Sequence, residues 1–292
     1  MADTLSPAKQ IGPPTGPRQP FAAALRATPV PVLIAAGFAV LLLAIVLVPG
    51  VFARYGPTIS HISDALQPPS AEYWFGTDRL GRDIFARVIH GARYSLLIGL
   101  GAMAISLLGG LLLGLLSALS GRVVDEVVTR ALDALAAYPT ILFALLVVTF
   151  TGPGTLNIAI AVGLSNIPRF GRIIRSDALV VRNADFARHS VMFGWRRFDV
   201  VLRHILPNVL RTIPVLATLD MGLSIMASSG LSFLGLGPKA PIPEWGVMLA
   251  ESRDVLHIAW WAGVFPGLTL TLAVIAFTVI GRHAQHRMGG MS

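Results

Sequence analysis

The sequence predicts an all-α, polytopic membrane protein with six transmembrane helices. Its 292 residues are 54% hydrophobic and only 13% charged, whereas a soluble domain has about 25% charged residues. The mean hydropathy is +0.71. Several apolar runs also reach the roughly 20 residues that cross the hydrocarbon layer of a bilayer. Together these three observations exclude an ordinary soluble domain.

The six spans follow from charge-free apolar runs and one break. The stretch 134–168 has no charged residue and is too long for one helix, and the Pro and Gly of TGPG at 151–154 favour a turn that divides it. The expected spans lie near 30–52, 95–118, 132–150, 155–174, 210–233 and 258–281. They make up a transmembrane domain over 29–285. A proline-rich tail at 1–28, expected to be disordered, precedes it, and a short tail at 286–292 follows it.

The distribution of arginine predicts the orientation of these spans. Between 169 and 203 there are eight arginines and three aspartates. An excess of basic residues marks the cytoplasmic loops of membrane proteins. The loop at 184–203 and both termini are therefore expected in the cytoplasm, and Glu244 and Glu251 are expected on the outer side.

Several classes of function are excluded or disfavoured by the sequence. The chain has no cysteine, which excludes disulfides and thiolate metal sites. It lacks the H-E-x-x-H spacing of a zinc enzyme. Its two lysines, Lys9 and Lys239, follow Ala and Pro, so it cannot hold the G-K-[ST] of a Walker A loop. The net charge of +8 is read as arginine that sets topology rather than as a nucleic-acid surface.

A basic, aromatic segment at 184–208 (ADFARHSVMFGWRRFDVVLRHILPN) separates two hydrophobic runs. Asp185 can cap a helix there, and one helical stripe would hold Phe186, Ser190, Phe193 and Arg197. One interpretation is an interfacial helix that Arg188, Arg196 and Arg197 hold on anionic lipid. A second is a docking helix for a soluble partner, with aromatic anchors and steering arginines. Both stay open on physical grounds, whereas a DNA-binding helix between two spans is disfavoured.

The same segment resembles the "EAA" cytoplasmic loop of ABC importer permeases. Gly194 and HILPN at 204–208 match that pattern, whereas Asp185 stands for its Glu, and His189 and Ser190 for its two alanines. Further stretches resemble the dipeptide, oligopeptide and nickel importer permeases, in particular their C-type subunit: FGTDRLGRDIFARVIHGARYSL (75–96), TRALDALAAYP (129–139), LSFLGLG (231–237), PEWGVML (243–249) and the last span (260–281).

The resemblance implies the permease fold of a type I ABC importer in the bacterial cytoplasmic (inner) membrane, with no catalytic or metal site in this chain. Its implied partners are a homologous B-type permease, two ATPase subunits that bind ATP and Mg, an extracytoplasmic binding protein and a short peptide. Nickel chelates, haem and glutathione stay open as solutes, and a stand-alone secondary transporter is the more distant alternative. The implied coupling helix to the ATPase holds Asp185, Phe186, His189, Ser190, Phe193, Gly194, Arg196 and Arg197. The implied periplasmic gate or docking element holds Phe75, Gly76, Asp78, Gly81, Arg82 and Asp83.

Polar and small residues within the spans supply further candidates. Asp220 either lines the translocation path or forms a hydrogen bond across the subunit interface, because a carboxylate inside a membrane is costly. Ser228 is the second candidate for the path and stands where the family often has Glu. Asp133 is expected to pair with Arg130. The G-x-x-x-G at 110–114 permits close helix packing, which the family would use within the permease dimer.

Overall fold

The computed structural model describes residues 28–289, and all of these that form regular structure are helical apart from one isolated bridge between Thr77 and Asp83. The all-α prediction is therefore confirmed. The predicted tail at 1–28 lies outside the described residues except for Thr28. The elements are α2 (Val30–Leu47), α3 (Pro49–Phe52), η1 (Ile62–Asp64), α4 (Ile84–Leu119), α5 (Arg122–Ala136), α6 (Thr140–Thr151), α7 (Thr155–Asn183), α8 (Asp185–Met192), α9 (Arg197–Val200), η2 (Val201–Ile205), α10 (Leu206–Leu231), η3 (Ser232–Leu236), α11 (Trp245–Ser252), η4 (Arg253–Val255) and α12 (Trp261–Gly289).

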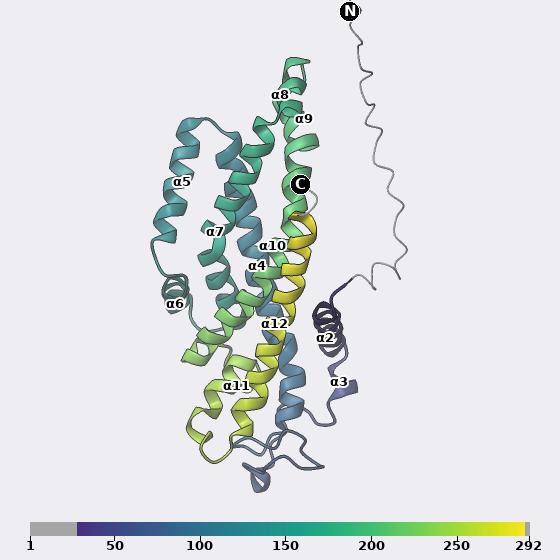
Figure 1. The fold of residues 1–292 in the computed structure, drawn as a ribbon. Coiled ribbons are helices and arrows are strands. Elements are labelled where there is room, and N and C mark those ends of the chain that lie inside the picture. The colour runs from purple at the N-terminus through teal and green to yellow at the C-terminus, as the bar shows by residue number, and fades with distance from the viewer. Residues whose placement is uncertain (1–27, 290–292) are drawn as a thin grey trace, which may run out of the picture.

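Four long helices, α4, α7, α10 and α12, run roughly along one direction and form the body of the molecule (Figure 1). Helix α2 packs beside α12, and α5 and α6 lie on the other side, against α7. One end of the body carries α8 and α9, and is called here the α8 end. The opposite end carries α11 and the loop at 53–83, and is called here the α11 end.

The contact between α4 and α7 is built on glycine. Helix α4 places Gly110 and Gly114 against Phe170 and Ile174 of α7, where a Cβ on Gly110 would lie 2.4 Å from the Cβ of Phe170. Without side chains at these positions, the two backbones approach closely and gain dispersion contacts. The G-x-x-x-G therefore packs α4 on α7 within one chain. The expectation that this motif packs against the second permease of the dimer is wrong for this face of α4.

The predicted span at 132–150 is not one straight helix. Helix α5 ends at Ala136, α6 begins at Thr140, and their axes meet at 89°. Pro139 explains the break, because it lacks an N–H and disfavours helical geometry at the residue before it. At the next boundary α6 ends at Thr151 and α7 begins at Thr155, which is where TGPG lies in the sequence.

Among the described residues, four helical segments are long and apolar enough to span a membrane: Val30–Leu47, Ile84–Leu119, Phe198–Leu236 and Trp261–Arg287. The bent pair α5–α6 could make a fifth span. Helix α7, the expected fourth span, does not meet the same criterion because asparagines and arginines interrupt its apolar residues. The count of six spans stays a prediction. The predicted C-terminal tail at 286–292 differs from the structure, in which α12 continues through Gly289.

Candidate functional site

The loop before α4 ends in a capped helix start. The carboxylate of Asp83 accepts hydrogen bonds from the backbone N–H groups of Phe85 (3.0 Å) and Ala86 (3.3 Å). This N-cap satisfies two N–H groups that have no partner within the helix. Burial raises the pKa of Asp83, and the two backbone hydrogen bonds oppose that rise. Asp83 therefore positions α4 and faces its own helix.

A tight turn at Asp78–Arg82 orients the charges of this loop. One oxygen of Asp78 accepts from the backbone N–H groups of Leu80 (2.8 Å) and Arg82 (3.0 Å). Gly81 adopts a φ of +69°, and a Cβ there would lie 1.7 Å from the carbonyl oxygen of His61. Only glycine fits both the conformation and the space, so the turn holds the Asp78 carboxylate in one place.

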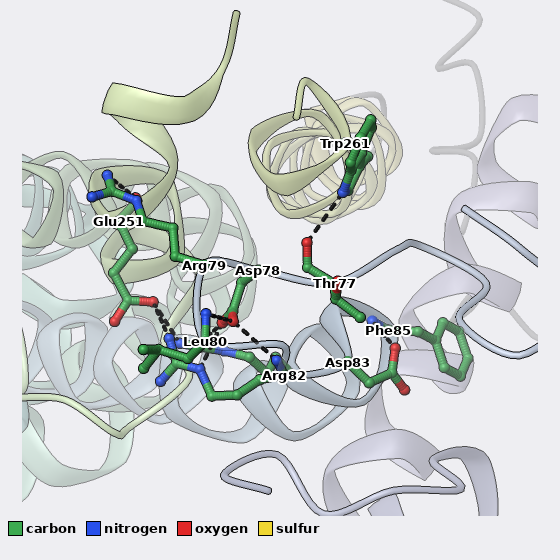
Figure 2. A network of polar contacts seen from close by, with 10 residues as sticks. Thr77, Asp78, Arg79, Leu80, Arg82, Asp83, Phe85, Glu251 and Trp261 are labelled. Atoms are coloured by element: carbon green, nitrogen blue, oxygen red, sulfur yellow. Dashed lines mark hydrogen bonds and ion pairs between the residues drawn. The ribbon is translucent and has the colours of Figure 1, made fainter. Parts of the chain in front are cut away.

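Four ion pairs link this turn, α4 and α11 to one another. Figure 2 shows Asp78, Arg82 and Glu251, which form two of these pairs. Oδ2 of Asp78 accepts from Nε of Arg82 and Nη1 of Arg87, each at 2.6 Å. Oε2 of Glu251 accepts from Nη2 of Arg82 (3.0 Å) and Nη2 of Arg87 (2.8 Å). The two guanidinium groups and two carboxylates thus alternate in a ring, called here the ionic square. Arg87 is only 1% exposed, and a charge buried that deeply needs such partners.

Beside the ionic square, Arg79 forms a more exposed ion pair with Asp254. Its Nη2 donates to Oδ2 of Asp254 and to the backbone oxygen of Glu251, both at 2.8 Å. A hollow of about 350 Å³ adjoins these groups. Its lining includes Asp78, Arg79, Leu80, Arg82, Ile84, Arg87, Met248, Glu251, Asp254, Val255 and Ala262.

The same loop also docks on α12. The ring of Phe75 stacks on that of Phe265 with centroids 4.1 Å apart. Nε1 of Trp261 donates to the backbone oxygen of Thr77 at 3.2 Å (Figure 2). Gly76 accepts from the N–H of Ile84. The loop is therefore held by α4, which follows it directly, and by α11 and α12, which lie much further along the chain.

At the α8 end, α8 leads into a reverse turn. Met192 and Phe193 are 82% and 84% exposed. Gly194 has a φ of +87° and no atom within 4 Å of its Cβ position. The N–H of Trp195 donates to the oxygen of Ser190 at 3.1 Å. Glycine is needed here for the backbone conformation, not for a close neighbour, and the turn presents two bare apolar side chains to the outside.

The turn corrects the expected stripe at 186–197. Helix α8 ends at Met192, so Phe193 lies in the turn and Arg197 begins a separate helix, α9. The side chains of Arg188 and Arg197 lie outside the described residues. Asp185 begins α8, and the carboxylate of Asp185, the ring of His189 and the side chain of Arg196 are exposed.

Phe186 and Ser190, the other members of the stripe, make contacts within the segment. The ring of Phe186 lies 5.8 Å from that of His204, which also lies 5.7 Å from Trp195. The hydroxyl of Ser190 donates to the backbone oxygen of Phe186 at 2.8 Å. Arg203 lies over the Trp195 ring at 5.2 Å. This small aromatic cluster holds α8 and the turn after it against η2, which leads into α10.

Asp220 is buried within the chain. Its Oδ2 accepts from Ser106 on α4 (3.0 Å) and from Ser224 one turn along α10 (3.2 Å), and the residue is 1% exposed. The hydroxyl of Ser228, also buried, donates to the backbone oxygen of Ile225. The hydrogen bond of Asp220 thus joins two helices of one chain, and neither side chain is open to a path in this conformation. A role in the path stays a prediction.

The expected Asp133–Arg130 pair is wrong. Arg130 pairs with Glu126 at 2.9 Å, one turn away on α5, and Asp133 lies 3.8 Å from Arg172 of α7. Glu126 and Arg130 are four residues apart with the acid first, which is the favoured order and spacing for an ion pair on a helix, whereas Arg130 precedes Asp133 by three residues. A pair that the sequence did not indicate, Asp125–Arg175 at 2.7 Å, ties α5 to α7.

Comparison with known families places the chain. The family model for the inner-membrane component of binding-protein-dependent transport systems matches residues 110–290. The chain belongs to this family.

Curated relatives of this permease include permease proteins of peptide and glutathione transport systems. It is 43% identical to the dipeptide transport system permease protein DppC of Alkalihalophilus pseudofirmus, over 75% of this chain and 72% of that one. It is 39% identical to the di/tripeptide transport system permease protein DppC of Pseudomonas aeruginosa, over 78% of each. It is 38% identical to the glutathione transport system permease protein GsiD of Pectobacterium atrosepticum, over 73% and 71%.

A solved structure also shares the fold. A chain from the crystal structure of an amino acid ABC transporter with histidines superposes with a TM-score of 0.54 at 15% identity, over 69% of this chain and 94% of that one. The resemblance to ABC importer permeases is therefore confirmed. The chain is a multi-pass membrane component of a transport system that also includes binding-protein and ATPase components, and as a permease it is not an enzyme.

Among the residues expected at the gate of this permease, the structure brings Asp78 and Arg82 into the ionic square. Phe75, Gly76 and Gly81 shape the loop, and Asp83 caps α4. The square's other two members, Arg87 and Glu251, were not anticipated as site residues. One signal could have found Arg87: it shares a helical face with Ile84 and Gly91, and a charge on an otherwise apolar or small face needs a buried partner.

Proposed function

We propose that the chain is the C-type permease subunit of an ATP-driven importer of short peptides and forms half of its translocation path. The printed names of two relatives, for dipeptides and for di- and tripeptides, support this solute class. Glutathione is the second candidate, supported by the relative at 38% identity. Nickel chelates and haem are supported by no relative named above.

The observation that carries the coupling role is the apolar tip of the α8 end, formed by Met192 and Phe193. Two large apolar side chains this exposed, in a segment rich in arginine, are the pattern of an anchored docking surface. The tip lies between the ends of α7 and α10, two of the four long helices. A partner that moves the tip would therefore move both helices as rigid levers.

The remaining parts of the proposal rest on the resemblance to peptide importer permeases and on the distribution of arginine. The partners are a homologous B-type permease, two ATPase subunits that carry ATP and Mg, and an extracytoplasmic binding protein. The α8 end and both termini face the cytoplasm of a bacterial cell, and the α11 end faces outward. The coupling residues would include Asp185, Phe186, His189, Ser190, Phe193, Gly194, Arg196 and Arg197.

Replacing Phe193 by Asp tests the coupling role. A desolvated aromatic anchor contributes about 2 kcal/mol or more at an interface, so the variant should lose about 30-fold or more in affinity for its ATPase subunits. Pull-down of the ATPase by wild-type and variant permease, at equal membrane levels, measures this loss. Arg196→Ala is the matched change at the rim, and it should cost less and depend on salt.

If Phe193→Asp permease retains its ATPase subunits and supports normal import, the docking role is refuted. The segment would then be an interfacial loop held on anionic lipid. Binding of the purified wild-type permease to anionic vesicles, compared with Arg196→Ala, would measure that alternative directly.

A further inference from the structure

The hollow beside the ionic square has the size of a small ligand site. Its volume of about 350 Å³ lies at the lower end of the roughly 300–1,000 Å³ that ligand pockets occupy. Part of its lining is apolar, with Leu80, Ile84, Met248, Val255 and Ala262. The rest is charged, which is the usual division between a wall that excludes water and a few polar groups that orient a ligand.

Hydrogen-bond donors remain uncommitted on its arginines. A guanidinium carries five N–H donors on three nitrogens. Within the part of the chain that the structure describes, Arg82 bonds through Nε and Nη2 and Arg79 through Nη2 alone. The hollow can therefore offer two or three N–H groups to an incoming carboxylate without breaking the square.

Acceptors remain on its carboxylates in the same way. Glu251 uses Oε2 for both arginines, and Asp254 uses Oδ2 for Arg79. Their second oxygens accept no hydrogen bond from the described residues. Figure 2 shows Glu251 extending from α11 toward Arg82, with Arg79 close to its backbone. Arg79 and Asp254 are also exposed, so a solute from outside the chain can reach them.

The lining contains three arginines and three acidic residues, so its formal charge is zero (3 − 3). The carboxylates of Glu251 and Asp254 would repel a simple anion, and the guanidinium groups would repel a simple cation. A molecule with a negative and a positive charge at separate ends can place each charge beside groups of opposite sign and so avoids both repulsions. The square holds Arg82 and Glu251 in place before binding, which lowers the cost of ordering them.

We propose that this hollow binds a short zwitterion, an amino acid or a dipeptide. Its carboxylate lies on Arg79 and Arg82, and its ammonium lies on Glu251 and Asp254. The binding chemistry stands on the hollow alone, whereas its place on an import route rests on the proposed function. It would be an entry subsite at the α11 end, ahead of the membrane-spanning path.

Calorimetric titration of the purified full-length permease tests the site with three probes: dialanine, alanine, and dialanine capped by an N-acetyl group and a C-terminal amide. Wild-type permease should bind dialanine or alanine and should bind the capped peptide at least tenfold more weakly. Arg79→Gln and Asp254→Asn should each weaken binding of the uncapped probe about tenfold, because each removes a charge-assisted hydrogen bond. Arg253→Gln is the matched control: it lies beside Asp254 but contacts Phe233 and does not line the hollow. It should leave binding unchanged.

The inference is overturned if wild-type permease binds no uncapped probe, if the capped peptide binds equally well, or if neither variant weakens binding. Alanine binding as tightly as dialanine assigns the site to the α-amino-acid group alone. Import of dialanine by the permease reconstituted with its partners is measured separately. If dialanine is imported but does not bind at the hollow, only this inference is refuted. If dialanine binds but is not imported, only the proposed peptide transport is refuted.

Discussion

Asp78 illustrates how much one side chain can organise. One of its oxygens closes the turn by accepting from Leu80 and Arg82, and the other binds the guanidinium groups of Arg82 and Arg87. The turn can be tight only because Gly81 has no side chain to strike the backbone of His61. Local geometry and long-range ion pairing therefore depend on the same few atoms.

Replacing Gly81 by Ala should destabilise the permease. The added Cβ would overlap the carbonyl of His61, and the positive φ disfavours any L side chain, so a loss of about 1–3 kcal/mol is expected. Thermal unfolding of detergent-solubilised permease, followed by fluorescence, should show a lower midpoint.

Gly121→Ala is the control for the same chemical change. Gly121 has an ordinary negative φ and no neighbour within 4 Å of its Cβ position. A smaller fall in the midpoint is expected for it, because Gly121 is the N-cap of α5 and alanine is a poorer N-cap than glycine. Equal midpoints for the two variants would contradict the structural role of the turn.

Helices α4 and α7 show how one element determines the place of another. Their contact depends on the glycines of α4, because Gly110 and Gly114 let the α7 backbone approach. Asp220 adds one polar bond, from α10 to Ser106 of α4. Burying a carboxylate is costly unless it is hydrogen-bonded, so this bond also limits how α10 can rotate against α4.

Replacing Gly110 by Val should force α4 and α7 apart. Its Cβ would lie 2.4 Å from that of Phe170 and 3.0 Å from backbone atoms of Phe170 and Gly171. Overpacking of this kind costs about 1–3 kcal/mol. The yield of monodisperse permease and its unfolding midpoint should both fall.

Gly37→Val tests whether valine itself is the cause. Gly37 lies in α2 and has no atom within 4 Å of its Cβ position. This variant should behave like wild type, and a wild-type midpoint for Gly110→Val would refute the close contact of α4 with α7.

The molecule as a whole has two ends with different chemistry. The α8 end carries an arginine-rich hairpin with an apolar tip, and the α11 end carries balanced charges around a hollow. Arginine is retained on the cytoplasmic side of bacterial membranes. The charge distribution therefore predicts which end faces the ATPase and which faces the solute.

Single cysteines test this orientation without background, because the natural chain has none. An impermeant maleimide added to intact spheroplasts should label Asp254→Cys and should label Arg196→Cys only after the membrane is permeabilised. Both positions are exposed, so accessibility to the reagent depends on the side of the membrane. Labelling of Arg196→Cys in intact spheroplasts would reverse the topology.

The order of the residues was enough to establish the all-α membrane class, the break near 151–154 and the family. Each of these depends on local properties: hydropathy over a window, helix breakers, and motifs of adjacent residues. Asp78, Gly81 and Arg82 of the turn at 78–82 were also named, from the resemblance to the family motif. The residues expected at the coupling segment lie in one hairpin because they are neighbours in the chain.

Only the tertiary structure decided which charges meet. Glu251 and Arg87 are 164 residues apart in sequence and 2.8 Å apart in space, and no local pattern specifies that pair. The same holds for the partner of Asp220 and for the faces of Gly110 and Gly114, because helix periodicity predicts a face and not what packs on it. The bend of 89° after α5 likewise replaced an expected straight span, because a proline can break a helix whose apolar residues continue on both sides. Long-range pairing follows from how the helices pack, and the hollow at the α11 end exists only once that packing is complete.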